Sequence, residues 1–526
     1  MEVLMSEADN SGTFRAPLSR RSLLSAGVAG SALLITPELL ATPAAAAVTD
    51  LAHLPSQREI WRDVVAMNHL GPRYTGNAAH KKFTRGLDAE LAGLGLKVEH
   101  LNRNALTLWE PTHAGLKTEH GTPIEIGATC RWSATTRPQG VTAPVQFCGR
   151  AEGSSFFSGD PSATEPLDFP IPPEVSGKIA LVEMPSIPIP FGQIYEGLVK
   201  GFVDPTHGGP IPAVQPYSPA WTTIESRLPS GYEAKLRAAG AVGVIYAWTN
   251  GVDDDAHGQF RRTGTEELPS CWVGMTAAKK LRALADRGGS VTLTIQAKVT
   301  KNVPTATTIA TLPGKSDEVI LLWTHTDGMN AVEENGAVAM LNLMRHFAKV
   351  PPAERNRTIV CVLTEGHFGG SAMADNWWID ARPEIAEKAV VALAMEHLGC
   401  REWLSDPARN IVEPANRPDI AWAYTLGPKD APNGLVPVML EALRGSRVAR
   451  TAVVDRAAAS ITPATYLWNK GKIPTIGYIS FNTYFLAEAR NGHIDKLDPA
   501  QLYDQVRTLG RAIEVIDRTP RAELRP

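Results

Sequence analysis

An apolar run that ends in polar side chains stands in the second half of the sequence, at Val319-Ile320-Leu321-Leu322-Trp323-Thr324-His325-Thr326-Asp327. A continuous apolar run of this kind is typical of a strand buried on both faces of a parallel sheet. Similar runs occupy residues 358–363, 389–395 and 474–479, and residues 336–348 have the apolar spacing of a helix. Strands that alternate with helices predict an α/β fold with a mainly parallel central sheet flanked by helices.

The residues before this core fall into two regions. Apolar residues at helical spacing predict helices over residues 57–68 and 78–92, and residues 97–101 alternate like a strand. Beyond them, short strand-like pieces separated by Pro and Gly predict a mostly β insertion, with strands at residues 143–148, 178–184, 242–246 and 291–295 and a helix at 232–239. The Pro-rich residues 185–219 show little periodicity, so we expect a long loop there, either a lid or plain surface.

These boundaries predict four parts of the chain. They are residues 1–47 as a signal segment, 48–114 as the first part of the core domain, 115–300 as the insertion and 301–526 as the α/β core. The length of 526 residues permits more than one folding unit. A net charge of -3 gives no field that would attract nucleic acid, so no nucleic-acid partner is expected.

The five cysteines include no C-x-x-C pair, which argues against a zinc site made of thiolates. Cys130 and Cys148 could form a disulfide, and the odd number leaves at least one thiol free.

The N-terminal segment has the order of an export signal. Arg20 and Arg21 precede a modest apolar run that reaches Leu34, and small residues follow at 44–47. The paired arginines resemble a twin-arginine signal, whose export machinery is then an expected partner. The alternative is an N-terminal membrane anchor, but the run is short and Pro37 and Pro43 interrupt it. We expect a soluble mature chain that begins near Val48, has no stable membrane anchor and is secreted, periplasmic or held at the cell surface.

Potential metal ligands follow each predicted core strand. His325 and Asp327 are two apart, so on a strand their side chains face the same way, and a carboxylate beside a ligating histidine orients its ring. Glu333 and Glu334 stand at a helix start, where acidic residues also occur simply because they favour the helix dipole. The later strands are followed by Glu365, His367, Glu396, His397, Glu488 and His493. Several buried carboxylates in one place require a cation, and mixed carboxylate and imidazole ligands suit zinc or a similar divalent ion.

This layout resembles the co-catalytic zinc aminopeptidase family, which also contains glutamate carboxypeptidases, glutaminyl cyclases and the non-catalytic transferrin receptor. The most specific match is Ala310-Thr311-Leu312-Pro313-Gly314 before the strand, followed by His325-Thr326-Asp327. The loop at residues 71–76 and the turn at residues 469–474 are also similar. Residues 177–182, 236–241 and 268–273 resemble the protease-associated domain that is often inserted in this family.

The resemblance implies a role for each candidate residue. His325 would bind one of one or two zinc ions, with Asp327 positioning it. The bridging aspartate of the family falls on Glu334, its third-strand aspartate on Glu396, and its late histidine near Glu488 to His493.

The sequence departs from the family where Thr364 stands at the position of the general base and where His367 and His397 are extra. Extra histidines indicate a site rebuilt around another ligand set. Two registers stay open. In the first register, Glu365 is the metal ligand and the general base is missing. In the second register, the motif has slipped by one residue, so that Glu365 is the base and His367 is the ligand. We favour the second, because it explains a histidine two residues later. His367 or His397 could instead stabilise an oxyanion.

The sequence thus predicts an exported metal-dependent hydrolase of peptide or small amide substrates. Glu365 and Asp327 are the predicted catalytic residues, and the predicted metal ligands are His325, Glu334, His367, Glu396 and His493. Aminoacyl cyclisation on the same fold and a non-catalytic binding protein are the two alternatives. Metal content separates the binding protein from the enzymes, and ammonia release without incorporation of water separates the cyclase from the hydrolase.

Overall fold

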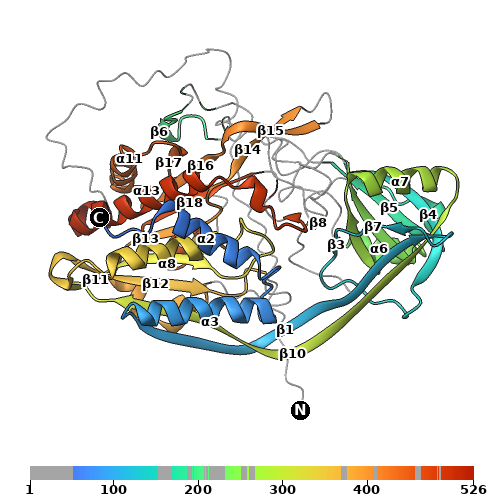
Figure 1. The fold of residues 1–526 in the computed structure, drawn as a ribbon, viewed down its shortest axis with the longest axis horizontal. Coiled ribbons are helices and arrows are strands. Elements are labelled where there is room, and N and C mark those ends of the chain that lie inside the picture. Colours follow the sequence, from blue (N-terminus) through green and yellow to red (C-terminus); the bar gives the residue numbers. More distant parts are fainter. Residues whose placement is uncertain are drawn as a thin grey trace.

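The computed structural model describes residues 51–151, 169–185, 192, 195–206, 208, 211, 231–249, 258–259, 267–368, 376–406, 411–456, 464–482, 484 and 487–526. The predicted export segment lies outside the described residues. Figure 1 shows a larger lobe of helices packed on a sheet and a smaller lobe that contains β4, β5 and β7. The long strands β1 (Lys97–Thr118) and β10 (Ser290–Leu312) run from one lobe to the other.

The centre of the larger lobe is parallel, which confirms the predicted fold class. β11 (Ser316–His325) lies between β12 (Arg357–Thr364) and β13 (Ala389–Met395), and β18 (Thr475–Ser480) follows beside β13. All of these neighbours pair in parallel. Their carboxyl ends therefore meet at one edge of the sheet, where ligands bind in open α/β folds.

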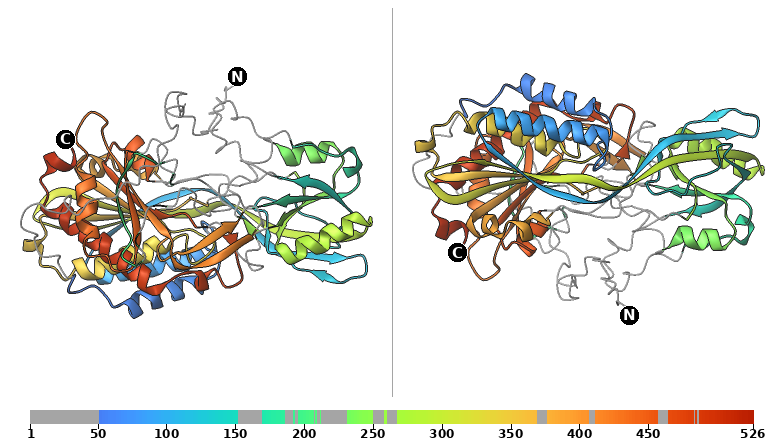
Figure 2. Two further views of the ribbon diagram at one scale, coloured as in Figure 1. Left: turned by 90° about the horizontal axis from the view of Figure 1, so that it is seen from above. Right: turned by 90° about the horizontal axis from the view of Figure 1, so that it is seen from below.

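The alternation of side chains along β11 explains why its sequence is apolar throughout. Ile320 and Leu322 belong to the core beneath α2 (Gln57–Asn68), α3 (Ala78–Gly93) and α8 (Asn335–Phe347). Val319, Leu321 and Trp323 belong to the core on the opposite face, with α9 (Trp378–Ala381) and α10 (Pro383–Lys388). Both faces are covered by helices, so neither set of side chains meets water. α13 (Pro499–Arg518) joins the first face, as the two views in Figure 2 and its core contacts indicate.

The outer part of the same sheet is antiparallel in places. β16 (Ile420–Leu426) pairs antiparallel with β18, and β17 (Arg450–Asp455) extends it in parallel. β6 (Val199–Val203) then pairs antiparallel with β17. β6 lies within residues 185–219, which we expected to form only a loop, so that expectation was wrong for these residues. The strand forms because it meets the distant edge of β17, a partner that local periodicity does not reveal.

The smaller lobe continues the sheet. β4 (Val141–Arg150), β5 (Ile179–Met184), β7 (Gly243–Trp248) and β9 (Ser270–Val273) pair in parallel, and β4 pairs antiparallel with β10. α6 (Tyr232–Ala238) and α7 (Met275–Asp286) belong to the separate apolar cores of this lobe. β1 and β10 each run through one of the expected boundaries, at residues 114/115 and 300/301.

Other described elements connect or extend the lobes. The short strand β8 (Gly258–Gln259) of the smaller lobe pairs with β19 (Ala487–Glu488) of the larger one, and β14 (Arg401–Asp406) forms a hairpin with β15 (Ile411–Pro418). All five cysteines are buried free thiols, so Cys130 and Cys148 do not form a disulfide. None of the helices among the described residues is long and apolar enough to cross a membrane.

Candidate metal and catalytic site

The ring of His325 is fixed at the carboxyl end of β11. Its Nδ1 donates a hydrogen bond to the main-chain carbonyl of Asp327 at 2.8 Å, which leaves the lone pair on Nε2. Nε2 is buried and has no hydrogen-bond partner among the described residues, and the nearest acid is Glu396, with Oε2 at 4.0 Å. Burial lowers the pKa of His325, and the nearby His367 acts in the same direction. The ring is therefore neutral, as a metal ligand must be.

The carboxylate of Asp327 holds together segments from three parts of the chain. Its Oδ2 accepts a hydrogen bond from Thr75 Oγ1 and another from the main-chain N–H of Phe368, both at 2.5 Å. Its Oδ1 is buried without a hydrogen-bond partner among the described residues and lies 3.8 Å from His325 Nδ1. The ring of His325 is thus oriented by the main-chain carbonyl of Asp327, and the carboxylate fixes the neighbouring loops.

Glu333 from the segment before α8 and Glu396 from the segment after β13 act on His325, and His397 follows Glu396. His397 Nε2 lies 3.4 Å from Glu333 Oε2, and its Nδ1 donates to the carbonyl of Ser480 at 3.0 Å. Burial would raise the pKa of Glu333, but the charge and hydrogen bond of His397 lower it below its ordinary value. Burial would likewise lower the pKa of His397, and Glu333 raises it. Each of these two buried residues therefore favours the charged form of the other.

Glu334 has a different neighbour from Glu333. Its Oε1 forms a buried ion pair with Nε of Arg73, which comes from the loop before α3. Burial lowers the pKa of Arg73 to about 9, so the guanidinium stays charged at neutral pH. Glu334 thus has its ion pair with Arg73 and Glu333 its contact with His397, while the charge of Glu333 also acts on Arg73.

Replacing Arg73 with Met should lower the free energy of unfolding by about 3–5 kcal/mol, because the buried carboxylate of Glu334 would lose its counter-charge. Chemical denaturation of the purified variant measures this loss. The double variant R73M/E334Q should recover part of it, since no buried charge then remains unpaired. Arg62→Met is the control, because its side chain is 69% exposed in its ion pair with Asp63. A loss below about 1 kcal/mol for R73M would contradict a structural ion pair.

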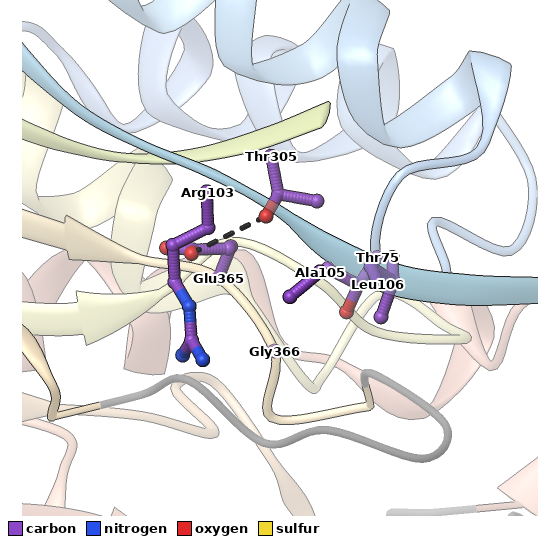
Figure 3. A pocket seen from close by; sticks show the side chains of 7 residues that line it. All are labelled: Thr75, Arg103, Ala105, Leu106, Thr305, Glu365 and Gly366. Atoms are coloured by element: carbon purple, nitrogen blue, oxygen red, sulfur yellow. Dashed lines mark hydrogen bonds between the residues drawn. The ribbon is translucent and has the colours of Figure 1, made fainter. Parts of the chain in front are cut away.

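Glu365 follows β12 but faces β10. It accepts hydrogen bonds from the hydroxyls of Thr307 and Thr305, the latter at 3.5 Å. Burial raises the pKa of Glu365 to about 7, although the bond from Thr307 opposes this. Figure 3 shows Glu365 in a pocket that is lined by Thr75, Arg103, Ala105, Leu106, Thr305 and Gly366. The guanidinium of Arg103 points away from Glu365 and lies 5.3 Å from the ring of Trp377.

His367 lies on the other side of the same segment and reaches His325. The two rings stack with centroids 4.3 Å apart and an angle of 27°. Glu365 and His367 thus have separate environments, one among threonine hydroxyls and one against the imidazole of His325. The choice between the two registers stays a prediction.

His493 is buried in the loop before α13, with its ring 5.6 Å from the ring of Tyr484. The main chain of this loop meets the site where the N–H of Ala331 donates to the carbonyl of Gly492 at 2.8 Å. The last candidate, Glu488, lies in β19, which pairs with the smaller lobe. The role of His493 as a ligand stays a prediction.

The structure therefore brings His325, Asp327, His367 and Glu396 together, and it adds residues that the sequence did not assign. The sequence indicates Glu333 as a helix cap or a ligand, and it gives no sign that Arg73 pairs with Glu334. The signal for Arg73 was its place in the loop at residues 71–76, which resembles the family, but nothing in the sequence indicates its partner.

The side chains of His325 and Glu396 have the chemistry of ligands to a divalent ion. Nε2 of the neutral His325 ring is buried without a hydrogen-bond partner among the described residues and faces the carboxylate of Glu396, and zinc prefers such nitrogen and oxygen ligands. Among the described residues, however, no three His, Cys, Asp or Glu side chains form a group that could hold a metal ion.

Comparison with solved structures identifies the class of fold. A peptidase M28 precursor from Shewanella amazonensis matches with a TM-score of 0.64 and 18% identity, over 89% of this chain and 94% of that one. BSAP, a zinc aminopeptidase from Bacillus subtilis, matches with a TM-score of 0.56 and 15% identity, over 90% of this chain and 98% of that one. Comparison of the sequence with protein-family models and with curated proteins finds no match.

The chain thus has the fold of the M28 zinc aminopeptidases. This confirms, at the level of the fold, the resemblance that the sequence suggested. A shared fold does not fix a reaction, so the chemistry has to be argued from the site.

Proposed function

We propose that the protein is a metal-dependent hydrolase of peptide or amide bonds. One observation carries the proposal: the buried lone pair of His325 Nε2 faces Glu396 and has no hydrogen bond from any described residue. Nothing in a purely structural polar core requires an unsatisfied imidazole nitrogen beside a carboxylate, because leaving such groups unpaired costs free energy. A site that binds a cation does require it.

His325 and Glu396 would hold the ion, and we propose His367, whose ring lies against that of His325, as the third ligand. Glu334 and His493 remain ligand candidates from the resemblance, with Glu334 in competition with its ion pair to Arg73. Both ring nitrogens of His397 already have acceptors, so we assign this residue to the charge of Glu333 and not to an oxyanion. A divalent ion, when bound, polarises the scissile carbonyl and acidifies a water molecule.

Glu365 supplies the proton transfer in this proposal. A general base works best when its pKa is near the working pH, and burial brings the pKa of Glu365 to about 7. Its carboxylate would take a proton from the attacking water and pass it to the leaving amine. Thr305 and Thr307 orient the carboxylate by hydrogen bonds, and Glu365 lines the adjacent pocket.

Metal analysis of the purified protein, combined with a panel of aminoacyl amides and peptides, tests the proposal. We expect stoichiometric zinc or a similar ion, hydrolysis of at least one amide, and loss of both after chelation. Ammonia release without incorporation of ¹⁸O from water would favour the cyclase. Protein that is folded, free of metal and inactive on every substrate would favour the binding protein.

We also propose that the protein is exported through the twin-arginine route. Replacing Arg20 and Arg21 with Lys should retain the uncleaved chain in the cytoplasm, because this route requires the arginine pair. Fractionation and immunoblotting of the expressing cells measure this. Arg15→Lys is the control and should export normally. Normal export of the double-lysine variant would rule out the twin-arginine interpretation.

A further inference from the structure

The side chain of Arg131, from the smaller lobe, contacts residues of the larger lobe beside the site. Arg131, which follows β3 (Ala128–Thr129), is buried, and its guanidinium donates to the main-chain carbonyl of Phe368 at 2.5 Å. The same guanidinium lies over the ring of Tyr74, 4.3 Å from its centroid. Arg131 thus contacts two segments of the larger lobe that are far apart in the sequence.

These two contacts adjoin the two hydrogen bonds that hold Asp327. Tyr74 precedes Thr75, whose hydroxyl donates to Asp327 Oδ2, and the N–H of Phe368 donates to the same oxygen. Tyr74 and Phe368 also pack together with Met329 in a small apolar cluster. Asp327 in turn accepts from His325 Nδ1 through its main-chain carbonyl. A continuous series of contacts therefore leads from Arg131 through Asp327 to His325.

Arg131 is held rigidly within its own lobe. The N–H of Cys130 donates to the carbonyl of Ser270 at 3.1 Å, and the N–H of Ser270 donates to Ser133 Oγ at 2.8 Å. The next residue, Trp132, is buried in the apolar core of the smaller lobe and has φ of 61°. A bulky residue in this left-handed region is strained, and surrounding structure must hold it there. This backbone conformation directs the side chain of Trp132 into the core of the smaller lobe and that of Arg131 toward the larger lobe.

We propose that Arg131 is a positioning residue through which the smaller lobe fixes the geometry of Asp327 and His325. This inference rests on the proposed function, because it assigns a catalytic consequence to that geometry. Arg131 contacts Phe368 and Tyr74, which adjoin the hydrogen bonds of Asp327, so we assign its effect to these two residues. Its charge also attracts Asp327 and Glu110.

Arg131→Met tests this role, with Arg131→Lys as the conservative variant and Arg137→Met as the matched control. Arg137 is exposed and lies on the same segment of the smaller lobe. In R131M we expect kcat to fall about 10- to 100-fold with KM little changed, as for other residues that orient a metal ligand. R131K should fall between R131M and the wild type, and R137M should match the wild type.

Hydrogen–deuterium exchange gives a readout that does not depend on activity. R131M should speed exchange in peptides that cover residues 364–368, while exchange in β7 stays at the wild-type rate. If R131M unfolds, R131K carries the same comparison. A wild type that is inactive on every amide would defeat the proposed function, and the exchange measurement would still test the contact. Unchanged exchange at residues 364–368, or equal increases there and in β7, would overturn the positioning role. Unchanged kcat would overturn its catalytic consequence.

Discussion

Glu365→Gln should reduce turnover by about two to four orders of magnitude while the protein keeps its metal, because a positioned general base contributes about that much. The amide of glutamine still accepts a hydrogen bond from Thr307 but takes no proton from water. Steady-state kinetics with an active amide substrate, together with metal analysis of the same preparation, measures both quantities. Loss of the metal in this variant would show that Glu365 is a ligand and that the first register is right.

The pH dependence gives an independent check on Glu365. Since the base must be deprotonated, kcat/KM should rise as the pH increases through about 7 and then level off. In E365Q this rise should be absent from the residual activity. A wild-type profile that is flat between pH 5 and 9 would contradict the assignment.

Glu514→Gln is the matched control, because burial raises the pKa of Glu514 on α13 to about 7 as well. Activity in E514Q should be that of the wild type. A carboxyl group whose pKa is raised on folding stabilises the protein below its unfolded pKa of about 4.5, and this contribution disappears as the pH rises through about 7. E365Q and E514Q should therefore each lose less free energy of unfolding than the wild type between pH 5 and pH 8.

His325→Ala should empty the metal site and abolish activity, because neighbouring side chains cannot replace the nitrogen that faces Glu396. Most of the fold should survive, since β11 is held by apolar contacts on both faces. Metal content by mass spectrometry and the circular dichroism spectrum test the two halves of this prediction. His113→Ala, on the exposed part of β1, is the control. Full metal content in H325A would place the ion elsewhere and defeat the proposed site.

His367→Ala separates the two registers when it is compared with E365Q. His367 lies against His325 and is the proposed third ligand, so H367A should lower the metal content while E365Q leaves it intact. The reverse result would mean that Glu365 binds the ion and His367 only packs against the site. Equal effects would contradict the division of roles between the two residues.

Local patterns in the sequence were sufficient for the core elements. The helices predicted at residues 57–68 and 78–92 are observed as α2 and α3, and the apolar runs are observed as β11, β12, β13 and β18. Burial on both faces requires a continuous apolar run, and a helix with one buried face requires its own spacing. Because neighbouring parallel strands end at one edge, the sequence also determined that His325, His367 and Glu396 would lie near one another.

Only the tertiary structure decided which charges compensate one another. Glu333 and His397 are 64 positions apart, Thr75 and Asp327 are 252 apart, and Arg131 and Phe368 are 237 apart. The strand β6 and the full length of β1 and β10 likewise depend on partners distant in the sequence. Periodicity records how each segment divides its side chains between apolar interior and water, which is a local property. Whether adjacent acids such as Glu333 and Glu334 face a histidine, an arginine or a metal depends on which distant segment packs against them, and that is fixed only when the whole chain has folded.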